Sequence, residues 1–250
     1  MLHSALKTWK NAATLIVTSN KTPPISVKNC CNETYNVLML KRSSKSTFFP
    51  SAHVFPGGNI EESDASSKWL EIFRPFVSDT QKLYQQFVVH QNAKERSPMF
   101  LQATESTSDL PREISYRISA IRETFEETGI LLAKRRHVNT ITTLNQYGDV
   151  LDLKPNEIEY WRTRVSNDAN EFLNMCIEKE CAPDIWALHE WSNWLTPAHM
   201  FTKNSKRYDT MFFITCLKSA PVYSQQDSKE VTSMSWESPC VTLKAFHQKK

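Results

Sequence analysis

The residues best suited to chemistry in this chain are three glutamates, Glu123, Glu126 and Glu127, spaced i, i+3 and i+4. At about 100° per residue, these positions share one face of a helix. Like charges at this spacing repel each other, and the helix dipole disfavours anions near a C-terminus. A solvated acidic face is the simplest interpretation. A divalent cation explains why the acids gather at this end, because Mg²⁺ prefers carboxylate oxygens and substrate phosphates.

The element that must present these acids spans residues 112–128. Its apolar residues recur at helical spacing and predict a buried stripe roughly opposite to the acids: Ile114, Ile118, Ile121 and Phe125. Pro111 suits the first turn, and Gly129 suits the position after the end. Arg122 lies beside Glu123, where its guanidinium can orient a carboxylate through a bidentate contact or remain an ordinary surface charge.

A second feature is the pair Gly57-Gly58, in a chain that has only 4 glycines among 250 residues. Average composition, about 7% Gly, would give roughly 17. Adjacent glycines in so Gly-poor a chain suggest a close backbone approach or a positive φ. A carbonyl or amide there could contact a metal or a phosphate, and a plain tight turn is the alternative.

Together, the two features resemble the signature of the Nudix hydrolase superfamily. Residues 122–130 (RETFEETGI) match its second half, R-E-U-x-E-E-x-G-U with U bulky and apolar, except that Thr124 occupies the first U position. Gly58 supplies the opening Gly, and Asp64 stands where the family usually has Glu. The usual signature has seven residues before the Arg, whereas residues 65–121 fill that interval here.

The long insertion, together with the phrases AHVFPGG (52–58) and WSNWLTP (191–197), resembles the peroxisomal coenzyme A diphosphatase branch of that superfamily. The resemblance implies one Nudix domain over residues 9–250, with the insertion at about 65–110. It implies an α+β fold (an α/β/α sandwich) with a mixed sheet between helices. Members of the branch continue beyond the position of Phe246 through a helix that covers the sheet. The C-terminal part of the family domain is therefore expected to be missing.

The resemblance also implies a metal site. Nudix enzymes hydrolyse a nucleoside diphosphate linked to another group and use Mg²⁺ or Mn²⁺. By this resemblance, the carboxylates of Glu123, Glu126 and Glu127 would hold the metal, with the Gly57 carbonyl as a further ligand. Glu126 and Arg122 would act in catalysis, and Glu230 is the candidate for the distal acid that often joins the site, a loop acid being the alternative.

For this branch the implied substrate is coenzyme A (CoA) or acyl-CoA, cleaved to 3′,5′-ADP and a 4′-phosphopantetheine. We expect basic residues to meet the 3′-phosphate, and Lys41 and Arg42 precede the glycine pair, where solubilising loop charges are the alternative. Gly58 is a further candidate for substrate binding. Two alternatives remain open: another diphosphate such as ADP-ribose or a dinucleotide, and a truncated module that binds nucleotide without catalysis.

Composition narrows the class of protein. The net charge of +3 is too weak to indicate nucleic acid, and no apolar run approaches the roughly 20 residues that span a membrane. Six cysteines without a signal peptide suggest buried thiols in an intracellular protein, and a monomer is expected. The resemblance implies a peroxisomal location, although residues 248–250 (QKK) are not a Ser-Lys-Leu signal. The acid-free N-terminus also resembles a mitochondrial presequence.

Hydrophobic patterns predict the remaining elements. Strands are expected near 12–18, 36–40, 52–55, 186–188, 191–195, 211–217 and 231–236, and helices near 69–73, 82–89 and 155–180. Trp186, Trp191 and Trp194 are expected in the core, with base stacking by one of them as the alternative.

Overall fold

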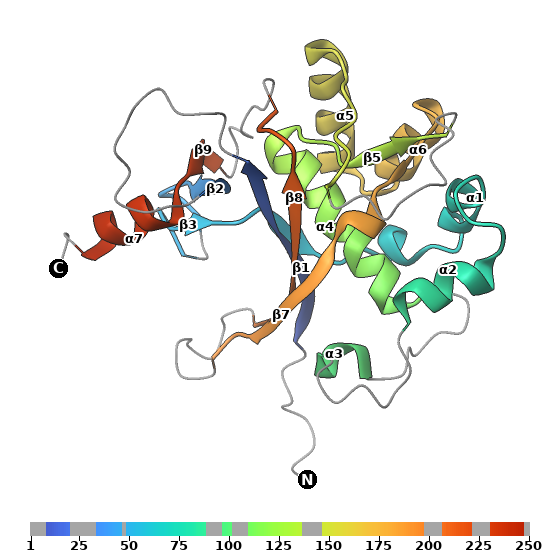
Figure 1. Cartoon of the computed structure of the whole chain (residues 1–250), viewed down its shortest axis with the longest axis horizontal. Coiled ribbons are helices and arrows are strands. Elements are labelled where there is room, and N and C mark those ends of the chain that lie inside the picture. The colour runs from blue at the N-terminus through green and yellow to red at the C-terminus, as the bar shows by residue number, and fades with distance from the viewer. Residues whose placement is uncertain are drawn as a thin grey trace, which may run out of the picture.

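A mixed β-sheet forms the centre of the molecule (Figure 1). The computed structural model describes residues 9–20, 34–46, 49–88, 97–101, 110–136, 147–197, 207–221 and 231–247. The main path of the sheet runs through β3 (His53–Val54), β2 (Tyr35–Arg42), β1 (Lys10–Asn20), β8 (Tyr208–Leu217) and β7 (His189–Leu195). β4 (Gly57–Asn59) also pairs with β1, and β9 (Val231–Glu237) pairs with β2.

The pairing directions make the sheet mixed. β1 and β8 run parallel over ten matched positions, from Lys10 opposite Tyr208 to Ser19 opposite Leu217. The pairs β1–β2, β1–β4 and β7–β8 are antiparallel. A separate two-stranded sheet joins β5 (Ala133–Arg135) to β6 (Cys181–Pro183). The predicted α+β class, with a mixed sheet and flanking helices, is confirmed.

The helix α4 (Arg112–Thr128) packs against one face of the central sheet and has the predicted bounds. Its four predicted apolar residues are fully buried, as are Ala13, Leu15 and Val17 of β1. Gly129 ends the helix with φ of 75°, and its N–H donates to the Phe125 carbonyl. A solvated acidic face is the wrong interpretation, because α4 is buried on nearly every side and Glu127 is only 9% exposed.

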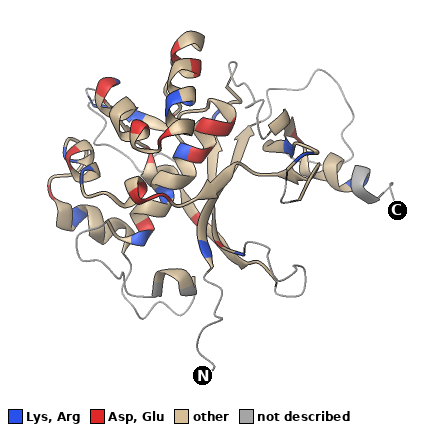
Figure 2. Ribbon diagram, turned by 180° about the vertical axis from the view of Figure 1, so that it is seen from behind, with Lys and Arg blue, Asp and Glu red and all other residues tan. Residues whose placement is uncertain are grey.

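Most of the other helices gather on the α4 side of the sheet (Figure 1). They are α1 (Trp69–Phe73), α2 (Thr80–Phe87), α5 (Pro155–Asn167) and α6 (Asn170–Glu178), with the short α3 (Pro98–Leu101) and the 3-10 turns η1 (Glu62–Ala65) and η2 (Ile185–Ala187). α7 (Pro239–His247) follows β9 and lies at the end of the molecule away from these helices. The charged residues lie mainly on this helical layer, and the strands carry few (Figure 2).

The insertion between the two halves of the signature belongs to the core of the domain. Trp69 of α1 packs on Phe172 of α6, with ring centroids 5.7 Å apart. Phe73 meets the Trp186 ring edge-on at the same distance. The inserted residues therefore add buried surface between α4, α6 and η2.

Some sequence-based predictions were wrong. The segment 155–180 contains two helices instead of one, since α5 ends at Asn167 and α6 begins at Asn170. Residues 185–187 form a 3-10 turn where a strand was predicted. Trp191 and Trp194 are 64% and 65% exposed and not in the core, because β7 is an edge strand of the described sheet.

Two further observations bear on composition. Cys176 and Cys181 are buried free thiols and Cys216 is a half-buried one, whereas Cys240 is disulfide-bonded, contrary to the expectation of thiols throughout. Among the described helices, none combines the length and apolar character that crossing a membrane requires.

Candidate active site

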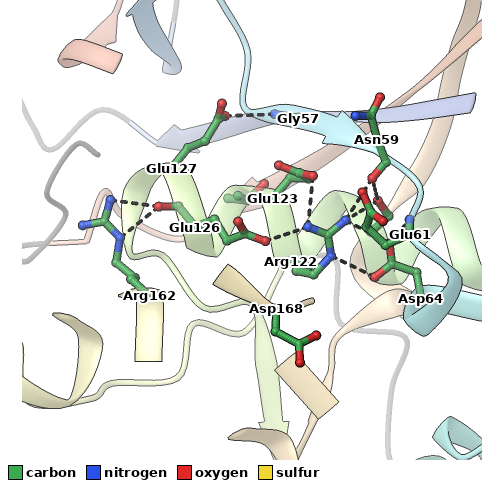
Figure 3. A network of polar contacts seen from close by, with 12 residues as sticks. Gly57, Asn59, Glu61, Asp64, Arg122, Glu123, Glu126, Glu127, Arg162 and Asp168 are labelled. Atoms are coloured by element: carbon green, nitrogen blue, oxygen red, sulfur yellow. Dashed lines mark hydrogen bonds and ion pairs between the residues drawn. The ribbon is translucent and has the colours of Figure 1, made fainter. Parts of the chain in front are cut away.

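One buried guanidinium connects the two halves of the signature (Figure 3). Arg122 Nε and Nη2 donate to Oδ1 and Oδ2 of Asp64, each at 2.9 Å, across 58 residues of sequence. Both side chains are almost completely buried, at 3% and 1% exposure. The predicted bidentate contact exists, and its carboxylate is the Asp that replaces the usual Glu of the signature.

The same guanidinium also holds the acids of α4. Nη1 donates to Oε1 of Glu123 at 3.0 Å and to Oε1 of Glu126 at 2.6 Å. Nη2 donates to the Asn59 carbonyl of β4 at 2.9 Å. Arg122 therefore joins η1, β4 and the end of α4 into one cluster of fixed geometry.

The cluster carries more negative than positive charge. Among the described residues, one cation, Arg122, faces the carboxylates of Asp64, Glu123 and Glu126 at hydrogen-bond distance. Burial raises the pKa of Glu123 to about 7, with Arg122 opposing the shift and Glu126 adding to it. Burial also raises the pKa of Glu126, against the guanidinium and a hydrogen bond with Ser166. These carboxylates would be stabilised by further positive charge.

The glycine pair lies directly against the acids. The Gly57 N–H donates to Glu127 Oε2 at 3.0 Å. A Cβ on Gly58 would lie 2.5 Å from Glu123 Oε1, and a Cβ on Gly57 would lie 2.5 Å from the Ala13 carbonyl oxygen. Close approach therefore explains both glycines. Gly57 allows β4 to pair with β1, and Gly58 leaves room for a carboxylate.

Arg162 of α5 fixes the end of α4, and sequence reasoning missed it. Its Nε and Nη2 donate to the backbone carbonyl of Glu126 at 3.0 and 2.9 Å. Carbonyls in the last turn of a helix lack partners within the helix. A cation at this end also interacts favourably with the negative end of the helix dipole. A signal was available: Arg162 lies at helical spacing between Ile158 and Val165, so a charge falls within an apolar stripe.

A cleft of about 1560 Å³ opens in front of the acids. Gly57, Gly58 and the four residues Arg122, Glu123, Glu126 and Glu127 line it. Of the two basic candidates, Arg42 lines the cleft, whereas Lys41 is exposed and is not among the lining residues. Glu230 lies outside the described residues. The junction of α5 and α6, residues 166–170, closes the cleft on the helical side.

The carboxylates of Glu123, Glu126 and Glu127 are ligands of the type that a divalent cation prefers. In the described ranges, no three His, Cys, Asp or Glu side chains converge as ligands. Glu123 and Glu126 turn to Arg122, and Glu127 turns to the Gly57 N–H (Figure 3). Yet all three carboxylates line one cleft, they are hard oxygen donors, and the cluster has excess negative charge. The residues are thus chemically suitable for holding a divalent cation.

The fold and the site together define a member of the Nudix hydrolases. The family model described as the NUDT19 Nudix domain matches residues 9–250, and the chain belongs to this family. It is 42% identical to the acyl-coenzyme A diphosphatase NUDT19 of Xenopus laevis over 100% of this chain and 67% of the relative. It is 35% identical to the protein of that name from Homo sapiens, over 97% and 64%.

The chain thus spans about two thirds of the length of these curated relatives. A solved structure shares the fold: a Nudix hydrolase from Alicyclobacillus acidocaldarius, with a TM-score of 0.62 at 18% identity. That match covers 98% of this chain and 85% of the other.

The buried pair of Asp64 and Arg122 should contribute strongly to stability. Replacing Asp64 with Ala leaves the guanidinium without its bidentate partner, and we expect a loss of about 3 kcal/mol in the free energy of unfolding. Glu71→Ala is the matched control, because it breaks an ion pair whose side chains are 72% and 64% exposed and should cost less than about 1 kcal/mol. Urea titration measures both, and equal losses would contradict the burial argument.

The two glycines should respond differently to substitution. In Gly57→Ala the new Cβ meets the backbone of Ala13 and Thr14, so we expect a loss of about 2–3 kcal/mol. In Gly58→Ala the three atoms nearest to the new Cβ all belong to the carboxylate end of Glu123, so rotation of that side chain should limit the loss to about 1 kcal/mol. Thermal melting compares them, and a Gly58 variant as unstable as the Gly57 variant would refute this assignment.

Proposed function

We propose that the chain is a metal-dependent diphosphatase that cleaves CoA or acyl-CoA into 3′,5′-ADP and 4′-phosphopantetheine or its acyl form. The observation that carries the proposal is the contact of Gly57 and Gly58 with Glu127 and Glu123, which unites the two halves of the signature at one cleft. The substrate class is supported by the names of the relatives that are 35–42% identical.

In this proposal Glu123, Glu126 and Glu127 hold the cation, with the Gly57 carbonyl as a further oxygen. When bound, Mg²⁺ or Mn²⁺ neutralises diphosphate oxygens and lowers the pKa of water. The Glu126 carboxylate accepts a proton from the attacking water. The water oxygen forms the new bond to phosphorus as the bridging P–O bond breaks. Arg122 keeps the acids in place through contacts of 2.6–3.0 Å.

The nucleoside end of the substrate is assigned to Arg42. This residue is partly buried in the cleft, with its Nε bonded to Ser46 Oγ at 3.1 Å, and it can pair with the 3′-phosphate. Lys41 does not line the cleft and is therefore not assigned to the 3′-phosphate. The role of Gly58 is to leave space for the Glu123 side chain. Glu230 remains a candidate distal acid. We further propose a monomer that acts on small molecules and not on nucleic acid, with the peroxisome as its compartment.

Hydrolysis of CoA tests the activity directly. With Mg²⁺, the purified chain should release 3′,5′-ADP, measured by chromatography, and Glu126→Gln and Glu127→Gln should each lower kcat by about 100-fold or more. Glu178→Gln is the matched control, since it changes an exposed glutamate on α6 outside the cleft lining. Absence of 3′,5′-ADP from the unaltered chain would refute the substrate. Release from ADP-ribose instead would indicate another diphosphate, and cation-induced stabilisation without turnover would indicate a binding module.

Recognition of the 3′-phosphate has its own test. Arg42→Gln should lower kcat/KM for CoA by about tenfold, because an ion pair to phosphate is lost, and should leave dephospho-CoA nearly unchanged. Lys41→Gln removes the neighbouring charge outside the cleft and should affect neither substrate. An equal loss on both substrates in the Arg42 variant would show that this residue does not contact the 3′-phosphate.

A further inference from the structure

Trp194 presents an aromatic surface to the cleft. It is 65% exposed although it belongs to the central sheet, and it lines the cleft together with Leu195 and Pro197. Its indole N–H donates to Ser192 Oγ at 3.0 Å, so the polar atom of the ring already has a partner. What Trp194 offers a ligand is therefore an apolar ring face. Trp191, on the same strand and equally exposed, is not among the lining residues.

The register of the sheet connects this ring with the acids. Trp194 pairs with Thr210, Thr210 with Ala12, and Ala12 with Asn59, whose carbonyl accepts from Arg122. Three inter-strand spacings of about 4.8 Å place Trp194 roughly 14 Å along this row. Phe212, two residues from Thr210 on β8, points to the same side and lines the same cleft. A ligand that is cleaved at the acids can therefore extend over this face of the sheet to Trp194.

The two ends of the cleft differ in charge. Arg42 lies on β2, Trp194 lies on β7, and β1 and β8 separate these strands (Figure 1). Among the described residues, those that line the β7 end of the cleft carry no charge: Trp194, Leu195, Thr196, Pro197, Tyr208 and Phe212. A doubly charged phosphate is costly to place against such a surface without a cation. The uncharged arm of the substrate suits it, because apolar contact there removes hydrocarbon from water.

We propose that Trp194, with Phe212, forms the subsite for the acyl end of the acyl-pantetheine arm and favours acyl-CoA over free CoA. This inference rests on the proposed function, since it names the direction in which that substrate lies. The phosphorylated nucleoside then extends the other way, toward Arg42, and the diphosphate between the two arms lies at the acids.

The experiment compares CoA with octanoyl-CoA for the unaltered chain and for Trp194→Ala, Trp194→Phe and Trp191→Ala. We expect Trp194→Ala to lower kcat/KM for octanoyl-CoA by about tenfold, as loss of apolar contact does, with less than a twofold change for CoA. Trp194→Phe keeps an aromatic ring and should retain most of the preference. Trp191→Ala is the matched control and should change neither substrate. Thermal melting checks that each variant is folded.

Two results would overturn the proposal. Equal losses on CoA and octanoyl-CoA in Trp194→Ala would show that the ring contacts a part that both substrates share and does not distinguish acyl-CoA from free CoA. An effect no larger than that of Trp191→Ala would remove Trp194 from the site. If the unaltered chain hydrolyses neither substrate, the proposed function fails, and calorimetric binding still decides this inference. A higher affinity for octanoyl-CoA that disappears in Trp194→Ala would support it, and a Trp194-independent difference would refute it.

Discussion

The whole site depends on a single charge kept out of water. Arg122 is buried at the wall of the cleft, and a buried guanidinium is stable only when its donors are paired. Asp64, Glu123, Glu126 and the Asn59 carbonyl provide those partners from η1, α4 and β4. Three elements must therefore take fixed positions around one side chain. The excess negative charge left at the cluster is the feature that makes it suitable for a cation.

Backbone packing places the acids as firmly as electrostatics does. Gly57 brings β4 within hydrogen-bond reach of Glu127, and Gly58 leaves space for the Glu123 carboxylate. At the far end of α4, Arg162 holds the Glu126 carbonyl. The last turn of the helix is thus held from β4 on one side and from α5 on the other. Rigid support of this kind limits the motion of carboxylates that would otherwise repel each other.

Much of the fold and part of the site could be predicted from local pattern. The stripe of Ile114 and Phe125 gives α4 with its observed bounds, and β1 and β8 follow from β-branched runs. The break at Asp168 between α5 and α6 and the exposure of Trp194 were missed. The exposure of Trp194 depends on neighbours distant in sequence, because a periodic apolar pattern shows which side is buried but not which strand ends the sheet. The break at Asp168 is local, since Asp168 Oδ1 accepts from the Asn170 N–H at 2.9 Å.

The sequence by itself determined the chemistry: which acids share a helical face, which glycines accompany them, and that an Arg stands beside them. These are properties of spacing and of side-chain type. They can be recognised even though an insertion separates the two halves of the signature. Only the tertiary structure decided the partners. Asp64 lies 58 residues from Arg122 and meets it because α4 packs beside η1. Arg42 and Trp194 share one cleft because the parallel pairing of β1 with β8 sets the distance between β2 and β7. Contacts of this kind follow from chain topology, which local pattern does not encode.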